Sequence, residues 1–246
     1  MKTQDFSPLA ALAMLFVPSS ATAGPLADRI GEKVTEFSAT APETTKQSYA
    51  EGIQAVVASG ITQSAKQVGD KAPDFTLRNA EGETRRLFEM LKKGPVVLTW
   101  YRGGWCPYCN LTLLALQEKL PEFKAAGVQL VALTPELPDK AAVTTAKNKL
   151  EFEVLTDLNH EVGREYGIVF KLTPGVRDLY QAKFKLTDFN GLKAGNGELP
   201  LAATYIITPD GTIRYAFLHA DYRERAEPAD LVTFVRQLNR AQPGKP

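Results

Sequence analysis

The sequence predicts an α/β fold with a central mixed sheet flanked by helices. Apolar, β-branched segments over 96–100 and 128–133 have the composition of buried strands, and helical patterns follow them. Near the C-terminus, two further apolar runs flank Pro209-Asp210-Gly211, a turn sequence typical of a β-hairpin. Strands that alternate with helices and then end in a hairpin indicate parallel central strands with an antiparallel edge.

Residues 1–23 have the composition of a secretory signal peptide. The apolar run from Leu9 to Val17 is too short for a transmembrane helix, and Ala21-Thr22-Ala23 has the small-x-small form of a signal peptidase site. We therefore expect cleavage after Ala23 and an exported protein, periplasmic or secreted. Because Lys2 is the one basic residue before the apolar run and Asp5 opposes it, a disordered or anchoring N-terminus is the alternative.

The next segment, 24–68, predicts an N-terminal helical extension. Ile30, Val34 and Phe37 share one helical face, and Pro42 interrupts the pattern. A second helix should end near Gly60. We expect these helices to pack on the main domain and see no chemistry in them.

The main domain is expected over 69–240, followed by a disordered tail at 241–246. Its expected elements are a turn at 79–82, a segment over 84–91, strands at 96–100 and 128–133, helices from 107 and over 138–150, a strand at 152–155, a short helix over 159–166, a hairpin over 204–217 and a helix over 228–240. We expect Pro121 and Gly127 to mark the end of the helix that begins at 107. Glycines in the segment 171–199 indicate an insertion.

The two cysteines of the chain, Cys106 and Cys109, follow the first buried strand and two glycines. Pro107 suits the first helical position, which places Cys106 at or next to the N-cap. The orphan N–H groups and the positive end of a helix favour a thiolate there, and Arg102 would add a positive charge nearby. Cys109 lies one turn later on the same face, with the Cα atoms about 5–6 Å apart, inside disulfide range.

Composition excludes several other classes of function. A formal net charge of +1 gives no reason to expect nucleic acid or an anionic membrane as a partner. Two cysteines are too few for a structural disulfide framework. A zinc site would need two further ligands, and His160 and His219, the two histidines, have no zinc-site spacing. We therefore expect redox chemistry at the cysteines, with no metal and no cofactor.

Three stretches resemble a known family: Gly69-Asp70-Lys71-Ala72-Pro73-Asp74-Phe75-Thr76-Leu77, the run from Tyr101 to Asn110, and the run from Ala203 to Ile213. Together with the order of elements they resemble the peroxiredoxins of the alkyl hydroperoxide reductase/thiol-specific antioxidant (AhpC/TSA) family, in the thioredoxin superfamily. The most similar subgroup carries the motif Arg-Gly-Gly-Trp-Cys-Pro-Tyr-Cys-Asn. The resemblance extends from about Gly31 to Leu238 and implies a thioredoxin-like fold of the peroxiredoxin type.

The resemblance implies a thiol peroxidase that reduces hydrogen peroxide or organic hydroperoxides. Cys106 matches the peroxidatic cysteine, which becomes a sulfenic acid, and Cys109 would be the resolving cysteine. The resulting Cys106–Cys109 disulfide would be reduced by a thioredoxin-like dithiol. Many relatives form dimers, which makes a homodimer a candidate assembly.

Two departures from the family pattern concern the peroxide site. The family generally has a proline seven residues before the peroxidatic cysteine and a threonine or serine three before it, where this chain has Thr99 and Gly103. The hydroxyl that orients the peroxide is thus missing from its usual place. The family's distant second arginine is absent from its usual place before the strand that starts at Thr204, so it is either missing or replaced by Arg102 or Arg214. We favour Arg102 because it is nearer to the cysteines.

Aromatic residues around the cysteines have two interpretations. Trp105 and Tyr108 flank the thiols and either form a hydrophobic peroxide pocket or pack in the core, and the same holds for Tyr101. Thr204, which begins the strand of the hairpin, is a further candidate for the pocket. The charged run 221–225 is interpreted as a solvated loop without a role.

Two other functions remain open. The chain would be a thiol–disulfide oxidoreductase if Cys-Pro-Tyr-Cys exchanges disulfides with another protein. Such proteins resemble one another in a cis-proline that faces the cysteines, where this chain has Ala203, with Pro200 three residues earlier. A non-enzymatic binding module is the third possibility, and the intact cysteine motif argues against it.

Overall fold

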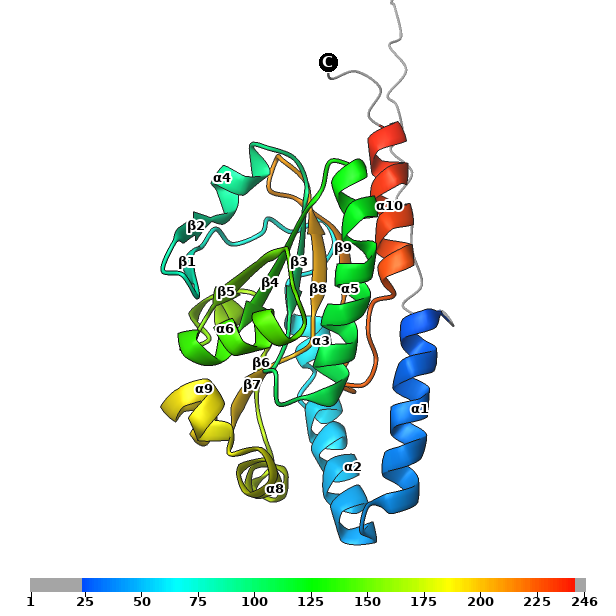
Figure 1. Ribbon diagram of the computed structural model, residues 1–246, viewed down its shortest axis with the longest axis vertical. Coiled ribbons are helices and arrows are strands. Elements are labelled where there is room, and N and C mark those ends of the chain that lie inside the picture. Colours follow the sequence, from blue (N-terminus) through cyan, green and yellow to red (C-terminus); the bar gives the residue numbers. More distant parts are fainter. Residues whose placement is uncertain (1–23, 242–246) are drawn as a thin grey trace, which may run out of the picture.

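The computed structural model describes residues 24–241, so the predicted signal peptide over 1–23 and the tail from 242 lie outside the described residues. At its centre is a seven-stranded sheet in the order β2-β1-β5-β4-β3-β8-β9, with β6 and β7 paired separately (Figure 1). Helices flank this sheet, which confirms the predicted α/β class. Within the described part of the chain, no helix is both long and apolar enough to cross a membrane.

The strands of residues 24–241 are β1 (Thr76–Asn79), β2 (Thr84–Arg86), β3 (Val96–Trp100), β4 (Gln129–Thr134), β5 (Glu153–Thr156), β6 (Val169–Lys171), β7 (Glu198–Pro200), β8 (Thr204–Ile207) and β9 (Ile213–Phe217). The helices are α1 (Pro25–Thr40), α2 (Glu43–Ala58), α3 (Ile61–Ser64), α4 (Leu87–Leu91), α5 (Pro107–Ala125), α6 (Pro138–Lys147), α7 (Glu161–Glu165), α8 (Pro174–Phe184), α9 (Leu186–Gly195) and α10 (Pro228–Ala241).

Strand directions follow the predicted order. β3, β4 and β5 are parallel neighbours, whereas β8 runs antiparallel to β3 and forms a hairpin with β9. In register, Val97 lies between Leu130 of β4 and Ile206 of β8. The parallel pair β3–β4 needs a crossover helix, and α5, which carries both cysteines, supplies it.

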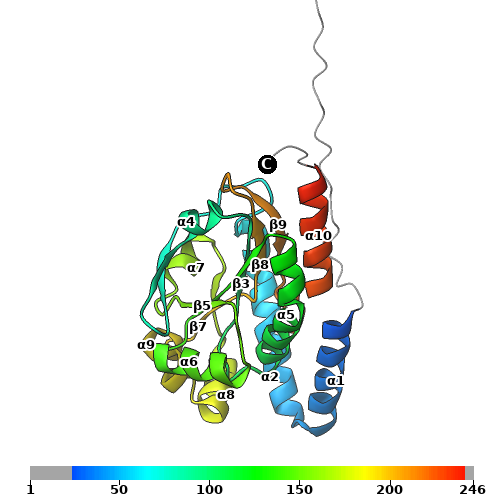
Figure 2. The ribbon, with the colours of Figure 1, turned by 45° about the horizontal axis from the view of Figure 1, so that its top comes forward.

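The alternation of side chains along β3 divides the core into two clusters. Val97 faces the helices α1, α5 and α10, which contribute Leu26, Leu116 and Val235. Val96 and Leu98 point to the other face of the sheet, toward α4 and α7. All five residues of β3 are buried because helices cover both faces. α5 and α10 lie side by side over the first of these faces (Figures 1 and 2).

One expectation about α5 was wrong. Pro121 does not end this helix, which continues to Ala125. The apolar face continues past the proline through Leu120 and Phe123, both buried. Packing of this face outweighs the missing N–H and the steric conflict that proline introduces in a helix.

The predicted insertion 171–199 is largely helical and lies near the N-terminal helices. It forms α8 and α9, and α8 packs against α2 (Figure 1). α1 packs along α5, where Arg29 and Glu118 form an ion pair at 2.9 Å. Phe37 of α1 and Tyr180 of α8 lie around one cavity together with Pro107, where α5 begins.

Candidate active site

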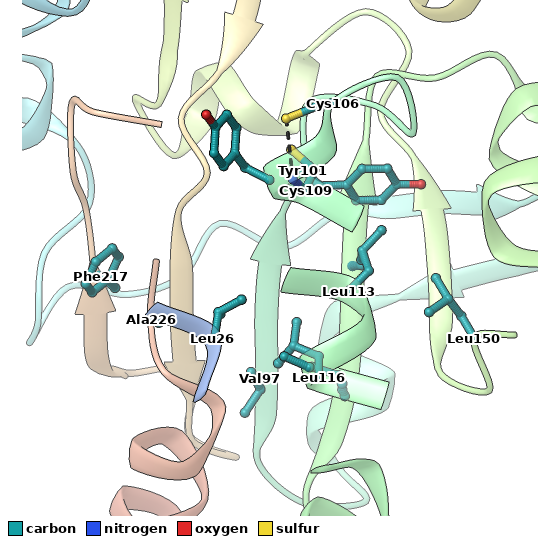
Figure 3. Close-up of a cluster of buried hydrophobic side chains, with 14 of the residues drawn as sticks. Leu26, Val97, Tyr101, Cys106, Cys109, Leu113, Leu116, Leu150, Phe217 and Ala226 are labelled. Atoms are coloured by element: carbon teal, nitrogen blue, oxygen red, sulfur yellow. Dashed lines mark hydrogen bonds between the residues drawn. The ribbon is translucent and has the colours of Figure 1, made fainter. Parts of the chain in front are cut away.

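Cys106 caps the N-terminus of α5, as the sequence predicts. Pro107 is the first helical residue, and the Cys106 Sγ atom accepts the backbone N–H of Cys109 at 3.4 Å. Figure 3 shows this hydrogen bond, with the two sulfurs at one end of the buried cluster that contains Leu113 and Leu116. Both cysteines are reduced and have no exposed surface.

The tight turn before the cysteines explains why no hydroxyl stands at position 103. Gly103 has φ +146°, and a Cβ atom there would lie 2.2 Å from Nε1 of Trp105. At Gly104 a Cβ atom would lie 2.1 Å from Oγ1 of Thr144. A side chain at either position would collide with its neighbours, and at 103 it would also be strained by the backbone.

A buried carboxyl group holds this turn in place. Glu136 follows β4 and accepts hydrogen bonds from the Gly104 N–H at 2.9 Å, the Thr144 hydroxyl at 2.9 Å and the Tyr101 hydroxyl at 2.7 Å. Burial raises the pKa of Glu136, while these hydrogen bonds oppose the shift. Tyr101 is therefore a core residue whose hydroxyl donates to Glu136, and of the two interpretations, peroxide pocket or core packing, the second holds.

Arg102 is the positive group nearest to Cys106. Its guanidinium is buried, with Nη2 3.2 Å from the Cys106 Sγ atom and Nη1 3.0 Å from the Tyr180 hydroxyl. The Tyr222 ring lies over it, 4.1 Å from ring centroid to Cζ. Arg214, the other candidate, is a half-buried residue of β9 with no bond to either sulfur.

The second cysteine has an arginine of its own, which the sequence analysis missed. The run 221–225 is not simply a solvated loop: Arg225 is 7% exposed, and its Nη2 lies 3.6 Å from the Cys109 Sγ atom. The guanidinium is held there by the carbonyl oxygen of Tyr222, which accepts bonds from Nε and Nη2. Two cationic side chains thus approach two sulfurs.

The two thiols ionise as a coupled pair. Burial would raise the pKa of Cys109, but the hydrogen bond from the Cys106 thiol and the charges of Arg225 and Arg102 hold it well below the usual value. Burial and the neighbouring Cys109 raise the pKa of Cys106, although Arg102 opposes this. The sequence predicts a lowered pKa at Cys106, whereas in the structure the lowered pKa is that of Cys109, and the two sulfurs ionise together between two guanidinium groups.

A cavity of about 160 Å³ lies against the Arg102 side of this pair. Its walls are mainly aromatic: Phe37, Tyr49, Trp105, Tyr108, Tyr180, Phe184 and Tyr222. Lys33, Glu36 and Lys183 add charged groups to the lining. Trp105 and Tyr108 therefore line a cavity, whereas Thr204 does not: its hydroxyl shares a hydrogen bond with Thr99 at 2.8 Å between β3 and β8.

The segment 171–199 forms part of the cavity wall and also contacts the loop before Cys106. The Asn190 side chain accepts a hydrogen bond from Trp105 Nε1 at 3.2 Å and donates one to the Arg102 carbonyl at 2.7 Å. Tyr180 and Phe184, one turn apart on α8, pack on the Trp105 ring. The insertion thus fixes both the loop before Cys106 and the cavity wall.

Within residues 24–241 no group of three or more His, Cys, Asp or Glu side chains is arranged to hold a metal ion. His160 is buried at the start of α7, and His219 is exposed.

Comparison with known proteins fixes the family. The sequence matches the AhpC/TSA family over residues 68–216, more than half of the chain. The chain belongs to the AhpC/TSA family. Family membership and the thioredoxin-like peroxiredoxin fold are therefore confirmed.

Curated relatives of this AhpC/TSA protein include both peroxiredoxins and a disulfide-exchange protein. Peroxiredoxin Bcp of Escherichia coli K12 is 30% identical over 103 residues, 42% of this chain and 65% of the relative. Thiol-disulfide oxidoreductase ResA of Bacillus thuringiensis is 30% identical over 104 residues, 42% of this chain and 59% of the relative. Chloroplastic peroxiredoxin Q of Gentiana triflora is 25% identical over 149 residues, 61% of this chain and 58% of the relative. The chain thus spans roughly three fifths of the length of these relatives.

Solved structures agree on the fold of the AhpC/TSA domain. Peroxidoxin BcpB of Mycobacterium tuberculosis superposes with a TM-score of 0.55 at 20% identity, covering 70% of this chain and 97% of the other. A mutant of peroxiredoxin 6 from Arenicola marina gives 0.55 at 17% identity, covering 72% and 76%. At this identity the likeness shows the fold alone.

Proposed function

We propose that this AhpC/TSA protein is a thiol peroxidase in which Cys106 reduces hydrogen peroxide or an organic hydroperoxide and Cys109 resolves the product. The observation that carries the proposal is the contact between Arg102 and the Cys106 sulfur beside an aromatic cavity. A guanidinium and a helix N-terminus stabilise a thiolate, and the cavity has room for a small molecule.

The choice of Cys106 as nucleophile depends on its position. Arg102 both lines the cavity and bonds the Cys106 sulfur, whereas Arg225, the partner of Cys109, does not line the cavity. A peroxide in the cavity therefore meets the environment of Cys106 first. A proton passed from Cys106 to Cys109 leaves the reactive thiolate beside Arg102.

The proposed cycle balances with the two sulfurs alone. The Cys106 thiolate attacks the terminal oxygen of ROOH, the O–O bond breaks, and a sulfenic acid and RO⁻ form; RO⁻ takes up a proton and leaves as ROH. Cys109 then loses its proton and attacks the Cys106 sulfur, the S–O bond breaks, and the sulfenic oxygen takes up a proton and leaves as water. The two electrons transferred to the peroxide leave a Cys106–Cys109 disulfide, so no cofactor is required.

Disulfide exchange with a protein substrate is the second candidate. The ResA relative and the Cys-Pro-Tyr-Cys sequence favour it. Neither sulfur has exposed surface, however, and exchange requires direct contact between a thiolate and a disulfide of the partner. A cavity with room for a small peroxide, lined by the Arg102 that contacts the Cys106 sulfur, favours the peroxidase.

The electron donor, the assembly, the location and the subgroup of the chain belong to the same proposal. We propose a thioredoxin-like dithiol as the electron donor, a homodimer as the assembly, and an exported, periplasmic or secreted location. We also place the chain in the subgroup with the motif Arg-Gly-Gly-Trp-Cys-Pro-Tyr-Cys-Asn, which residues 102–110 spell out.

Mass spectrometry of the Cys109→Ser protein tests the proposal. After one equivalent of hydrogen peroxide, or of an alkyl hydroperoxide, with a sulfenate-trapping reagent present, we expect a rapid adduct on Cys106. In the unmutated protein a Cys106–Cys109 disulfide should replace it. If neither peroxide causes the trapping reagent to label Cys106 faster than a free thiol, the result would contradict a peroxidase and favour disulfide exchange.

A further inference from the structure

Tyr180 places a hydroxyl group against the arginine that contacts Cys106. Tyr180 lies on α8, is 3% exposed, and lines the cavity. Its oxygen accepts a hydrogen bond from Arg102 Nη1 at 3.0 Å. Among the described residues, this hydroxyl donates no hydrogen bond of its own. A phenol that accepts from a cation and keeps its proton is arranged to donate.

Arg102 aligns this hydroxyl with the sulfur of Cys106. The two terminal nitrogens of one planar guanidinium bond the Tyr180 oxygen and, at 3.2 Å, the Cys106 Sγ atom. The phenol and the thiol are therefore neighbours on the same fork. A peroxide whose terminal oxygen approaches the sulfur would bring its second oxygen toward the hydroxyl.

Within the described residues, Tyr180 is the one tyrosine of the cavity lining whose hydroxyl bonds Arg102, and two other sources of a hydroxyl are absent from the cavity. Position 103 has no side chain and, as shown above, no space for one. The hydroxyls of Thr99 and Thr204 bond each other between β3 and β8, away from the cavity lining. Burial raises the pKa of Tyr180, so the phenol keeps its proton at neutral pH.

We propose that Tyr180 is the catalytic acid of the peroxide step and donates its proton to the oxygen that leaves. This inference rests on the proposed peroxidase function. As the Cys106 thiolate forms a bond to the terminal oxygen, the O–O bond breaks and its electron pair goes to the second oxygen. That oxygen takes the phenolic proton and leaves as ROH, and the phenolate, held by Arg102, is reprotonated from water.

The test compares two peroxides that differ in their need for an acid. tert-Butyl hydroperoxide releases an alkoxide, which requires a proton, whereas peracetic acid releases acetate, a stable anion in water. For Tyr180→Phe we expect the rate of Cys106 oxidation by tert-butyl hydroperoxide to fall about 10²-fold, the range of general acid catalysis. The rate with peracetic acid should change less than about threefold, because the phenyl ring preserves the packing on Trp105.

Controls separate this role from a structural one. Tyr215→Phe removes the hydroxyl of a tyrosine that packs on Phe234, outside the cavity, and should leave both rates unchanged. An equal loss with both peroxides in Tyr180→Phe would show that Tyr180 only positions Arg102, and would overturn the proposal. A variant unaffected with both peroxides would overturn it equally.

A measurement on the unmutated protein keeps the proposal testable if Tyr180→Phe does not fold. Proton donation during O–O cleavage predicts a larger solvent deuterium isotope effect with tert-butyl hydroperoxide than with peracetic acid. Equal isotope effects would overturn the role of Tyr180 and leave the peroxidase intact. Absence of oxidation by both peroxides would instead contradict the peroxidase itself.

Discussion

The two sulfurs are held by contrasting parts of the chain. The partners of Cys106 are local: Arg102 lies four residues before it and the Cys109 N–H three residues after it. The guanidinium at Cys109 comes from Arg225, 116 residues later, beyond the hairpin β8–β9. The first environment is built into one strand–helix turn, and the second forms only when the whole domain has folded.

This contrast suggests a division of roles between the two arginines. Arg102 lines the cavity and contacts Cys106, so it acts where a peroxide would arrive. Arg225 contacts Cys109 without lining the cavity, so it acts where the disulfide would form. Substitution of each arginine in turn tests whether these roles are separate.

The largest effect is expected from Arg102→Met. Removing the guanidinium leaves the buried Cys106 thiolate without its cation and the Tyr180 hydroxyl without its donor. We expect sulfenate formation at Cys106 to slow by about 10²–10³-fold, comparable to the loss of one donor to a reacting anion. Stopped-flow measurement of Cys106 oxidation in the Cys109→Ser background checks this step alone.

Stability provides the control for this variant. Removing one partner of a buried charge pair is destabilising unless the other partner becomes neutral, and here the thiols can become neutral by taking up a proton. The denaturation midpoint of Arg102→Met should therefore stay close to that of the parent. Arg102→Lys, which keeps the charge without the planar fork, should give an intermediate rate, and a rate as fast as the parent's would argue against the fork geometry.

A smaller effect, on the second step of the cycle, is expected from Arg225→Met. Loss of the guanidinium at 3.6 Å from the Cys109 Sγ atom should slow disulfide formation by at least about tenfold, since hydrogen bonds to charged groups contribute about 1.5–3 kcal/mol and about 1.4 kcal/mol corresponds to tenfold. The rate of sulfenate formation should change little. Time-resolved trapping of the Cys106 sulfenate would show it accumulating. Slowing of the first step to the extent seen in Arg102→Met would contradict separate roles.

The parts of the site that could be predicted from the sequence are those built by residues close to Cys106 in the chain. The apolar run over 96–100, the two glycines and Pro107 predict the strand, the turn and the N-cap at Cys106, because strand burial and helix capping depend on adjacent residues. The nearness of Arg102 follows from its position in the chain. Pro121 shows the limit, since tertiary packing of Leu120 and Phe123 carried α5 past it.

The remainder of the site depends on contacts distant in sequence. Nothing next to Arg225 or Asn190 marks either as a neighbour of the cysteine motif, and a charged run reads as surface when its partners are unknown. Tyr180 and Phe184 gave a weak signal, an aromatic pair one helical turn apart in a segment taken for an insertion. The shared ionisation of the thiols also required the structure, since it depends on the distances to both guanidiniums.

The smallest effect is expected when one of the two cysteines is replaced and the pKa of the other is measured. This is also the most direct test of whether the two thiols ionise as a coupled pair. Cys109→Ala removes the hydrogen bond and charge that raise the pKa of Cys106, so this pKa should fall. Cys106→Ala removes the hydrogen bond that lowers the pKa of Cys109, so that pKa should rise. The pH dependence of iodoacetamide alkylation measures both, because the thiolate alone reacts. The midpoint of the pH profile should move to lower pH in the first variant, relative to Cys106 in the parent protein, and to higher pH in the second, relative to Cys109. The absence of a shift in both variants would mean that each sulfur titrates with its own arginine and that the two ionisations are not coupled.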